Sequence, residues 1–327
     1  MRIAITGEDG FIAKNLIKQI KEFDHAYISL KKHGHFLSSR LEETGEPCVY
    51  SNDEENWYRT FTTLDIDVIV HNAAVVGTDV VALNGKHSNM TNVYGTQVIT
   101  NAANRAGILN VYIGTSVIYD TKIYQDVEIT EKSKIFPRTL YAIQKYAGEM
   151  IVRNTAKEYL VIRPLFAYGG EGDMNSLIAK SMFAVKNNKE NIDMFLDPEK
   201  IKDYMHVMDF CNAIMTAIVS DKRNNDYNVS ANNPYKTAMI INKIQNHINC
   251  DLSRIIKWHE DTDYLGNHRL SSNKFRKDFN WKNQISFEEG IEMSWYSIQN
   301  CDDDYNPLKY LEQAKESNVN LKDFFPK

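Results

Sequence analysis

Tyr141 and Lys145 are the two residues whose types and spacing point most directly to acid/base chemistry. They stand four residues apart in "TLYAIQKYAGE", whose pattern predicts a helix, so both side chains share one helix face. An ammonium beside a phenol favours the phenolate and lowers the phenol pKa from about 10 toward neutrality. Tyr141 is then a usable acid or base, and Lys145 can also hold a cofactor ribose. Because such a pair occurs by chance in many helices, a third group is needed.

Two hydroxyl side chains, Thr115 and Ser116, supply that third group. They end the apolar run in "NVYIGTSVIYD", which predicts a buried strand. A hydroxyl at the carboxyl end of a strand points into the crevice where doubly wound sheets bind their ligands. We therefore expect these hydroxyls to lie beside the substrate, close to Tyr141 and Lys145.

The glycines of "ITGEDGFIAKNL" predict a phosphate-binding turn between a strand and a helix. Gly7 permits the tight turn, Gly10 lets the backbone approach a pyrophosphate, and Ala13 keeps the helix close to the strand. The phosphate would meet free N–H groups and the positive end of the helix. A glycine pattern alone is weak, but its place directly after the first predicted strand favours a dinucleotide over a plain turn. The predicted cofactor-binding residues of this turn are Gly7, Gly10, Phe11 and Ile12.

The end of the second predicted strand bears on which dinucleotide binds. NAD-binding proteins usually carry an acidic residue there for the ribose hydroxyls, whereas the 2′-phosphate of NADP calls for cations. After "AYISL" the chain has Lys31 and Lys32 and no Asp or Glu. These lysines favour NADP(H), although two solvated lysines at the end of a strand explain the pattern equally well. NAD(H) therefore stays open.

The elements that must position these residues alternate between strand and helix. Short runs rich in Ile, Val and Tyr, typical of buried parallel strands, recur as "RIAIT", "AYISL", "DVIVHNA", "NVYIGTS" and "YLVIRPL". Segments of helical period lie between them. Because parallel neighbours need a crossover, this alternation predicts an α/β fold with a Rossmann-type doubly wound parallel sheet. After about Pro164 the rhythm weakens, which indicates a second, smaller lobe.

Composition and charge argue against several other classes of protein. A chain of 327 residues with 43% apolar residues supports a globular core, and a net charge of −5 gives no footprint for nucleic acid. The four cysteines and nine histidines show no metal-ligand spacing, so we expect free thiols and no metal. The sequence shows no signal-like segment and no run approaching the ~18 apolar residues of a membrane span. We expect a soluble, cytoplasmic protein with no membrane partner.

Seven motifs, taken in order, resemble those of the extended short-chain dehydrogenase/reductase family, in its group of nucleotide-sugar epimerases, dehydratases and reductases. The resemblance covers about residues 1–300. The motifs are "TGEDGFIA" (6–13), "HNAA" (71–74), "NVYGT" (92–96), "GTSVIYD" (114–120), "YAIQK" (141–145), "RPLFAYG" (163–169) and "KDYMHVMDF" (202–210).

This resemblance implies a role for each predicted site residue. Thr115 would hydrogen-bond the C4 oxygen of the sugar, Tyr141 would be the acid/base, and Lys145 would assist it. Family members commonly pair through two helices each, including the one with the Tyr-Lys motif, so we also expect a homodimer. The further coenzyme contacts implied are Ala73, Asn92 and Asp53, the last of them at adenine.

Departures from the family patterns narrow the expected chemistry. Members that eliminate water across C5 and C6 carry an Asp-Glu pair after the active-site Thr, where this chain has Ser116 and Val117. Uronic-acid decarboxylases carry a Glu, and fucose-synthase-like members a Cys, where Val117 stands. The latter also use a His in the substrate helix, and the matching position here is Leu177. What remains is chemistry at C4 alone.

The side of the site that would hold the nucleotide also departs from the family. Lys202 stands where an Arg usually contacts the diphosphate, and Phe166 stands where an Asn is usual. Arg269 lies where the family often places an arginine on the diphosphate, and Asn175 could contact the same group. Each of these polar residues also has a plain surface interpretation, so the base and the sugar stay open. The predicted substrate-binding residues are Thr115, Ser116, Asn175, Lys202 and Arg269.

The function that these observations favour is an NADPH-dependent reduction of a 4-keto nucleotide-diphosphate sugar. An NAD-dependent 4-epimerase is the alternative, and a non-catalytic NAD(P)-binding sensor or scaffold is a third. The expected Rossmann domain spans residues 1–165, with 199–230 and about 285–300 returning to it, the latter as the family's closing helix. The expected sugar-binding lobe comprises 166–198 and 231–284, and residues 301–327 form a C-terminal appendage.

Overall fold

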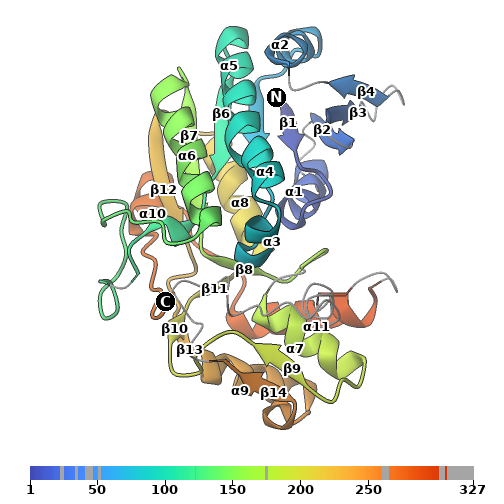
Figure 1. Cartoon of the computed structure of the whole chain (residues 1–327), viewed down its shortest axis with the longest axis vertical. Coiled ribbons are helices and arrows are strands. Elements are labelled where there is room, and N and C mark those ends of the chain that lie inside the picture. Colours follow the sequence, from blue (N-terminus) through green and yellow to red (C-terminus); the bar gives the residue numbers. More distant parts are fainter. Residues whose placement is uncertain are drawn as a thin grey trace.

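The chain forms a larger lobe around a central sheet and a smaller lobe beneath it (Figure 1). The structure is a computed structural model, and it describes residues 1–22, 26–33, 36–40, 47–50, 53–121, 123–173, 176–259, 265–301 and 306–307. Among these residues no helix is long and apolar enough to cross a membrane.

The central sheet has eight strands in the order β12-β7-β6-β5-β1-β2-β3-β4. Every pair from β12 to β2 is parallel, whereas β3 and β4 extend the edge in antiparallel fashion. This confirms the predicted α/β fold with a parallel central sheet. The strands are β1 (Arg2–Thr6), β2 (Ala26–His33), β3 (Phe36–Arg40), β4 (Pro47–Tyr50), β5 (Val68–His71), β6 (Leu109–Ile113), β7 (Tyr159–Pro164) and β12 (Asn225–Val229).

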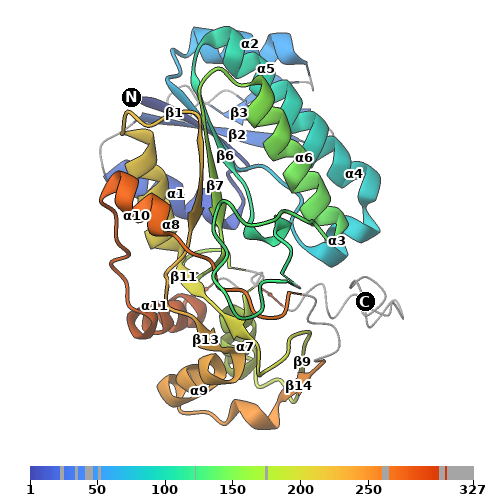
Figure 2. The same cartoon turned by 90° about the vertical axis from the view of Figure 1, so that its left-hand side faces the viewer.

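Helices cover both faces of the sheet, because successive side chains of a strand point to opposite faces. In β1, Ile3 and Ile5 join the core under α1 (Phe11–Glu22) and α8 (Val207–Ile218). Ala4, between them, faces the opposite core under α2 (Glu54–Thr63) and α5 (Thr96–Ala106). Helix α6 (Leu140–Thr155) lies beside α5 on that second face (Figure 2). Three short segments, α3 (Thr78–Leu83), α4 (Gly85–Asn89) and the π-helical turn η1 (Met90–Gly95), lead into α5.

The smaller lobe has its own apolar core, built mainly from α7, α9 and α11. It meets the larger lobe at β8 (Phe166–Tyr168), which pairs in parallel with β11 (Tyr204–His206). The other elements of this part of the chain are α7 (Leu177–Lys186), β9 (Ile192–Met194), β10 (Ile201–Lys202), β13 (Tyr235–Lys236), α9 (Thr237–Ile248), η3 (Leu252–Arg254), β14 (Ile256–Trp258) and α11 (Phe287–Gln299).

The course of the chain after residue 270 differs from the expected domain boundaries. Helix α10 (Asn273–Phe279) returns to the larger lobe, where Phe275 and Trp281 join the core beside β12. Helix α11, expected to return there, instead packs against α7 and α9 through Phe287, Ile291 and Ile298. An apolar helix stripe predicts that the helix is buried but not which core buries it, so the sequence pattern did not decide between the two lobes. Residues 302–305 and 308–327 of the expected appendage lie outside the described residues.

Candidate active site

The glycine turn joins β1 to α1 and packs directly against the chain that follows β5. Gly7 has φ +74°, and the N–H of Gly10 donates to its carbonyl oxygen at 2.9 Å, so that α1 begins at Phe11. A Cβ atom at Gly7 would lie 2.8 Å from the Cα of Ala73. Position 7 therefore requires a glycine, and the turn ends at the start of α1, where the positive end of a helix favours an anion such as a phosphate. The N–H of Ala73 donates to the Thr6 hydroxyl at 3.0 Å, which holds the two segments together.

We expect Gly7→Ala to weaken coenzyme binding at least tenfold and to lower the melting temperature. An alanine at this φ is strained by about 1–2 kcal/mol, and here the backbone of Ala73 must also move. Gly107→Ala is the matched control, because Gly107 has φ +71° but a Cβ there would meet no described atom within 4 Å. Calorimetry and coenzyme titration of both variants check this. Equal losses of affinity in the two variants would contradict a coenzyme site at the turn.

Thr115 and Ser116 lie at the carboxyl end of β6, as their place after an apolar run predicts. Thr115 is 7% exposed and begins the short 3-10 turn η2 (Ser116–Ile118), where its hydroxyl accepts from the N–H of Val117 at 3.4 Å. Ser116 is buried. Ser116 and Val117 carry no ionisable group, so the two positions after Thr115 supply neither an acid nor a base.

Helix α6 brings Tyr141 and Lys145 to the same strand end. The Thr139 hydroxyl accepts from the N–H of Ala142 at 3.1 Å and so caps the start of the helix. Tyr141 stands in the first turn and is half-buried, whereas Lys145, one turn later, is buried. The Lys145 ammonium donates to the carbonyl oxygen of Ile113 at 2.7 Å, two residues before Thr115. The Lys145 side chain therefore lies at the end of β6 that leads to Thr115, and Tyr141 stands one helical turn before it on α6.

Tyr112, on β6, is a site residue that the sequence analysis missed. Its ring centroid lies 4.4 Å from the Lys145 Nζ, a cation–π distance, and its hydroxyl donates to the Lys145 carbonyl oxygen at 3.0 Å. A Cβ at Gly148 would lie 2.5 Å from the Tyr112 hydroxyl, so this glycine lets α6 approach β6. No local signal distinguishes Tyr112 from any buried strand tyrosine, because its role depends on which helix face packs on it.

Burial sets the ionisation of this cluster. It lowers the pKa of Lys145 to about 7, against the opposing influence of the Glu149 carboxylate. Burial also raises the pKa of Tyr112 well above its ordinary value, with Glu149 and Tyr141 acting in the same direction. It lowers the pKa of His71, on β5, to about 3, and the Lys145 charge adds to that effect. Near neutral pH, Lys145 is therefore the member of this cluster poised to titrate.

Two of the predicted coenzyme residues act on the protein itself in this structure. Asn92 is buried and clamps the chain after β5: its side-chain oxygen accepts from the N–H of Val75, and its amide donates to the Val75 oxygen. That amide also donates to Gln144, the neighbour of Lys145 in the same motif, at 3.0 Å. Asp53 is exposed and caps α2, because its carboxylate accepts from the N–H of Glu55 at 2.9 Å. Asn92 thus joins the segment after β5 to α6, and Asp53 has a structural partner that the sequence analysis did not foresee.

Lys31 and Lys32 lie within β2 rather than after it. The parallel pairing of β2 with β1 ends at Leu30, opposite Thr6, and the two lysines pair with Ser38 and Leu37 of β3 instead. The second strand is therefore longer than predicted, and its last part forms a hairpin with β3. The backbone of both lysines still lies just beyond the carboxyl end of β1, beside the glycine turn. Their side chains lie outside the part of the structure that is described.

The predicted substrate residues of the smaller lobe differ from one another in burial and in hydrogen-bond partners. Lys202 is fully buried, and its ammonium donates to the Gly266 carbonyl oxygen at 2.7 Å, so it offers no surface to a diphosphate. This does not support the role expected for Lys202. Arg269 is half-buried, and its buried Nε has no hydrogen-bond partner among the described residues, which fits an anionic ligand. Asn175 lies outside the described residues.

The fold and the site define the class of protein: a dinucleotide-binding α/β protein with a Thr-Tyr-Lys set at the carboxyl end of a parallel sheet. The chain belongs to the NAD dependent epimerase/dehydratase family, whose model matches residues 3–230. Groups of three or more His, Cys, Asp or Glu able to hold a metal ion are absent from the part of the chain that the structure describes.

Individual relatives are distant and cover nearly the whole chain. The dTDP-D-glucose 4,6-dehydratase of Mus musculus is 24% identical over 321 residues, which span 90% of this chain and 88% of the relative. Among solved structures, the UDP-glucose 4-epimerase of Thermotoga maritima matches with a TM-score of 0.76 at 20% identity, covering 90% of this chain and 98% of the other. The protein RMD from Pseudomonas aeruginosa also matches with a TM-score of 0.76, at 17% identity, covering 91% and 98%. At these identities the solved structures show the fold alone.

Proposed function

We propose that this protein transfers a hydride between a nicotinamide coenzyme and C4 of a nucleotide-diphosphate sugar. The observation that carries this proposal is the hydrogen bond of the Lys145 ammonium to the end of β6, two residues before Thr115, from a helix whose first turn carries Tyr141. Relatives and structural neighbours that act on dTDP- and UDP-sugars support the substrate class. The glycine turn and the start of α1 would hold the coenzyme diphosphate. The Nε of Arg269, which has no partner among the described residues, would face the diphosphate of the sugar nucleotide.

The bound coenzyme supplies the hydride, and the chain supplies the proton. In the reductive direction Tyr141 gives its phenolic proton to the C4 oxygen, because the Lys145 ammonium one turn away makes the phenol a stronger acid. The Thr115 hydroxyl orients the same oxygen by a hydrogen bond. The burial of Lys145 among Tyr112, His71 and the end of β6 keeps water away from the ammonium and fixes its direction.

Within this chemistry the reduction of a 4-keto sugar by NADPH is our first proposal. Lys31 and Lys32, whose backbone lies beside the glycine turn, are suited to the 2′-phosphate of NADP. The structural neighbour RMD was solved in complex with NADPH, which supports the same coenzyme. The test is NADPH consumption with UDP-, dTDP-, GDP- and CDP-linked 4-keto-6-deoxy sugars, where we expect one nucleotide form to be reduced. Silence across the four forms would overturn the reductase.

A 4-epimerase is the second candidate, because several structural neighbours are UDP-glucose 4-epimerases, two of them in complex with NAD or NAD+. Such an enzyme would use Tyr141 first as base and then as acid, and its redox-neutral cycle must retain the coenzyme. Mass spectrometry of the small molecules released by denaturing the purified protein separates the candidates. Retained NAD or NADH favours the epimerase, whereas NADP(H), or an empty site that prefers NADPH, favours the reductase.

The 4,6-dehydratases among the relatives raise a third activity, which this site is poorly equipped to perform. Elimination of water across C5 and C6 needs an acid and a base close to those carbons. Ser116 and Val117 follow Thr115 directly and supply neither. This chain and the dehydratases belong to one family, but we propose that the chemistry of this chain is confined to C4.

We also propose that two copies of the chain pair through α6 and its neighbour η1. Five large apolar side chains on these two elements are between 37% and 50% exposed, and exposed apolar side chains on neighbouring elements favour a surface that a partner covers. They are Leu140, Ile143, Met150, Met90 and Tyr94. Light scattering after size exclusion should give twice the chain mass of 37.7 kDa, and Ile143→Lys should give the single chain. A monomeric parent protein would contradict the pairing.

A further inference from the structure

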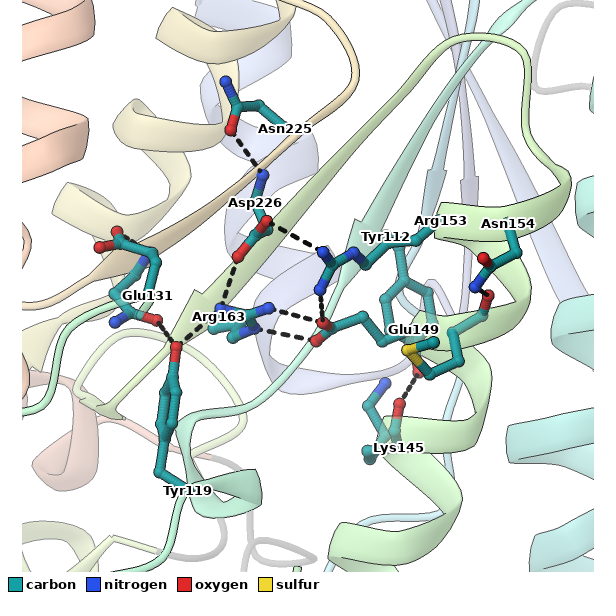
Figure 3. Close-up of polar contacts among 12 residues, drawn as sticks. Tyr112, Tyr119, Glu131, Lys145, Glu149, Arg153, Asn154, Arg163, Asn225 and Asp226 are labelled. Atoms are coloured by element: carbon teal, nitrogen blue, oxygen red, sulfur yellow. Dashed lines mark hydrogen bonds and ion pairs between the residues drawn. The ribbon is translucent and has the colours of Figure 1, made fainter. Parts of the chain in front are cut away.

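Arg163, on β7, is a fully buried cation held by four hydrogen bonds or ion pairs (Figure 3). Its Nε and Nη2 donate to the two carboxylate oxygens of Glu149 at 2.9 and 2.6 Å, the side-by-side arrangement that arginine and carboxylate prefer. Its Nη1 donates to the Tyr119 hydroxyl at 2.7 Å and lies 2.9 Å from the Asp226 carboxylate. Burial opposes this charge, but the hydrogen bonds and charge of Glu149 raise the Arg163 pKa above its ordinary value, so the guanidinium stays ionised.

The partners of Arg163 come from the two segments that carry the proposed catalytic residues. Glu149 lies on α6, four residues and so one helical turn after Lys145. Tyr119 directly follows η2, four residues after Thr115, which begins that turn. The Tyr119 hydroxyl also donates to the Asn228 side chain on β12 at 2.8 Å, so the link is anchored in the sheet. The Arg163 guanidinium thus connects the segment that follows Thr115 with the turn of α6 that follows Lys145.

A stabilising role alone does not account for this arrangement. Burying an ion pair costs desolvation that its attraction often fails to repay, so a well-packed apolar set of similar volume is commonly as stable. What the guanidinium adds is direction, because its planar fork donates hydrogen bonds to its partners in fixed geometry. We infer that Arg163 is a positioning residue, which sets the separation between Thr115 and the Tyr141–Lys145 face of α6. This inference rests on the proposed function.

The experiment removes the hydrogen bond between Arg163 and Tyr119 and leaves every charged group of the cluster paired. Tyr119→Phe keeps the buried ring and deletes only the hydroxyl that Arg163 reaches, while Glu149 and Asp226 still pair with the guanidinium. Tyr227→Phe is the matched control, because Tyr227 is a buried tyrosine on β12 whose hydroxyl donates to Asp278 rather than to either catalytic segment. Amide hydrogen exchange and steady-state kinetics are measured on both variants and on the parent protein.

In Tyr119→Phe we expect the backbone amide hydrogens of both segments, 114–120 and 140–149, to exchange at least threefold faster than in the parent protein. We also expect kcat to fall about tenfold, with KM unchanged within twofold. Tyr227→Phe should change neither segment nor kcat. The inference would be overturned if amide exchange became faster only in 114–120, or in neither segment. An unchanged kcat would overturn it as well. Because hydrogen exchange needs no substrate, it decides the inference even if the parent protein proves inactive. Inactivity of the parent toward every sugar nucleotide would overturn the proposed function instead.

Discussion

Tyr141→Phe should lower kcat by about 10³-fold while leaving the dissociation constant of the coenzyme within twofold of the parent value. The substitution removes the phenolic hydroxyl and, with it, the proton that the proposed mechanism gives to the C4 oxygen. The ring and the helix that carries it stay in place, because the cap at Thr139 and the hydrogen bonds of Lys145 to β6 do not involve the Tyr141 hydroxyl. Initial rates of NADPH oxidation and fluorescence titration with NADPH measure the two quantities.

Tyr146→Phe is the control for this prediction. Tyr146 lies five residues further along α6 and is also half-buried, and its ring packs against the apolar cluster that contains Ile118 and Tyr119. Tyr146→Phe keeps that ring and its packing. It should keep the parent kcat. If Tyr141→Phe keeps it as well, the enzymatic assignment fails. The protein is then better described as an NAD(P)-binding sensor or scaffold.

The pH dependence should report Lys145. Burial lowers the pKa of this lysine to about 7, so kcat/KM for reduction should fall on the alkaline side with a midpoint near that value. As pH rises through the midpoint, Lys145 loses its charge and Tyr141 becomes a weaker acid. The other groups that face Lys145 are Tyr112 on β6, His71 on β5 and Glu149 on α6. Tyr112 and His71 stay neutral across this range because burial moves their pKa values away from it.

Lys145→Met tests whether the fall of kcat/KM on the alkaline side arises from Lys145. The variant should have a rate reduced by about 10²–10³-fold, and its residual activity should no longer change near pH 7. An unchanged alkaline midpoint would assign the limb to another group. The lowered pKa of Lys145 affects folding stability in the direction opposite to activity. Between pH 7 and the ordinary lysine pKa of 10.5, the unfolded chain binds more protons than the folded chain. The contribution of Lys145 to stability is therefore least favourable below pH 7 and improves as pH rises.

The sequence predicted those parts of the molecule that depend on local patterns. The parallel sheet follows from alternating apolar runs and helical segments, and the structure confirms it. The turn at Gly7, the strand that ends before Thr115, and the helix with Tyr141 and Lys145 all lie where their residue types and spacing predict. Each of these features is set within a few residues of chain, so one sequence suffices to find it.

What the sequence did not show depends on contacts between distant segments. Lys202 looks like a surface cation in its motif, but the carbonyl of Gly266 and the packing of the smaller lobe bury it. Asp53 follows a strand as a ligand residue would, yet its partner is the start of α2. Arg163 and Tyr112 lie in apolar strands without any local signal, because their roles arise only when α6 packs on β6 and β7. For the same reason the sequence did not show that α11 packs in the smaller lobe.

Confinement of the chemistry to C4 is tested most directly by one experiment in D2O. The protein is incubated with NADPH and the 4-keto sugar nucleotides, and separately with UDP-hexoses, and the products are followed by NMR. Reduction or epimerisation at C4 breaks no C–H bond at C3, C5 or C6, so these carbons should carry no solvent deuterium while the configuration or oxidation state of C4 changes. Deuterium at C5 beyond the level that enolisation of the 4-keto sugar gives in a protein-free control, or loss of water from the sugar, would contradict confinement of the chemistry to C4. Enzymatic exchange at C5 requires elimination or epimerisation at a neighbouring carbon.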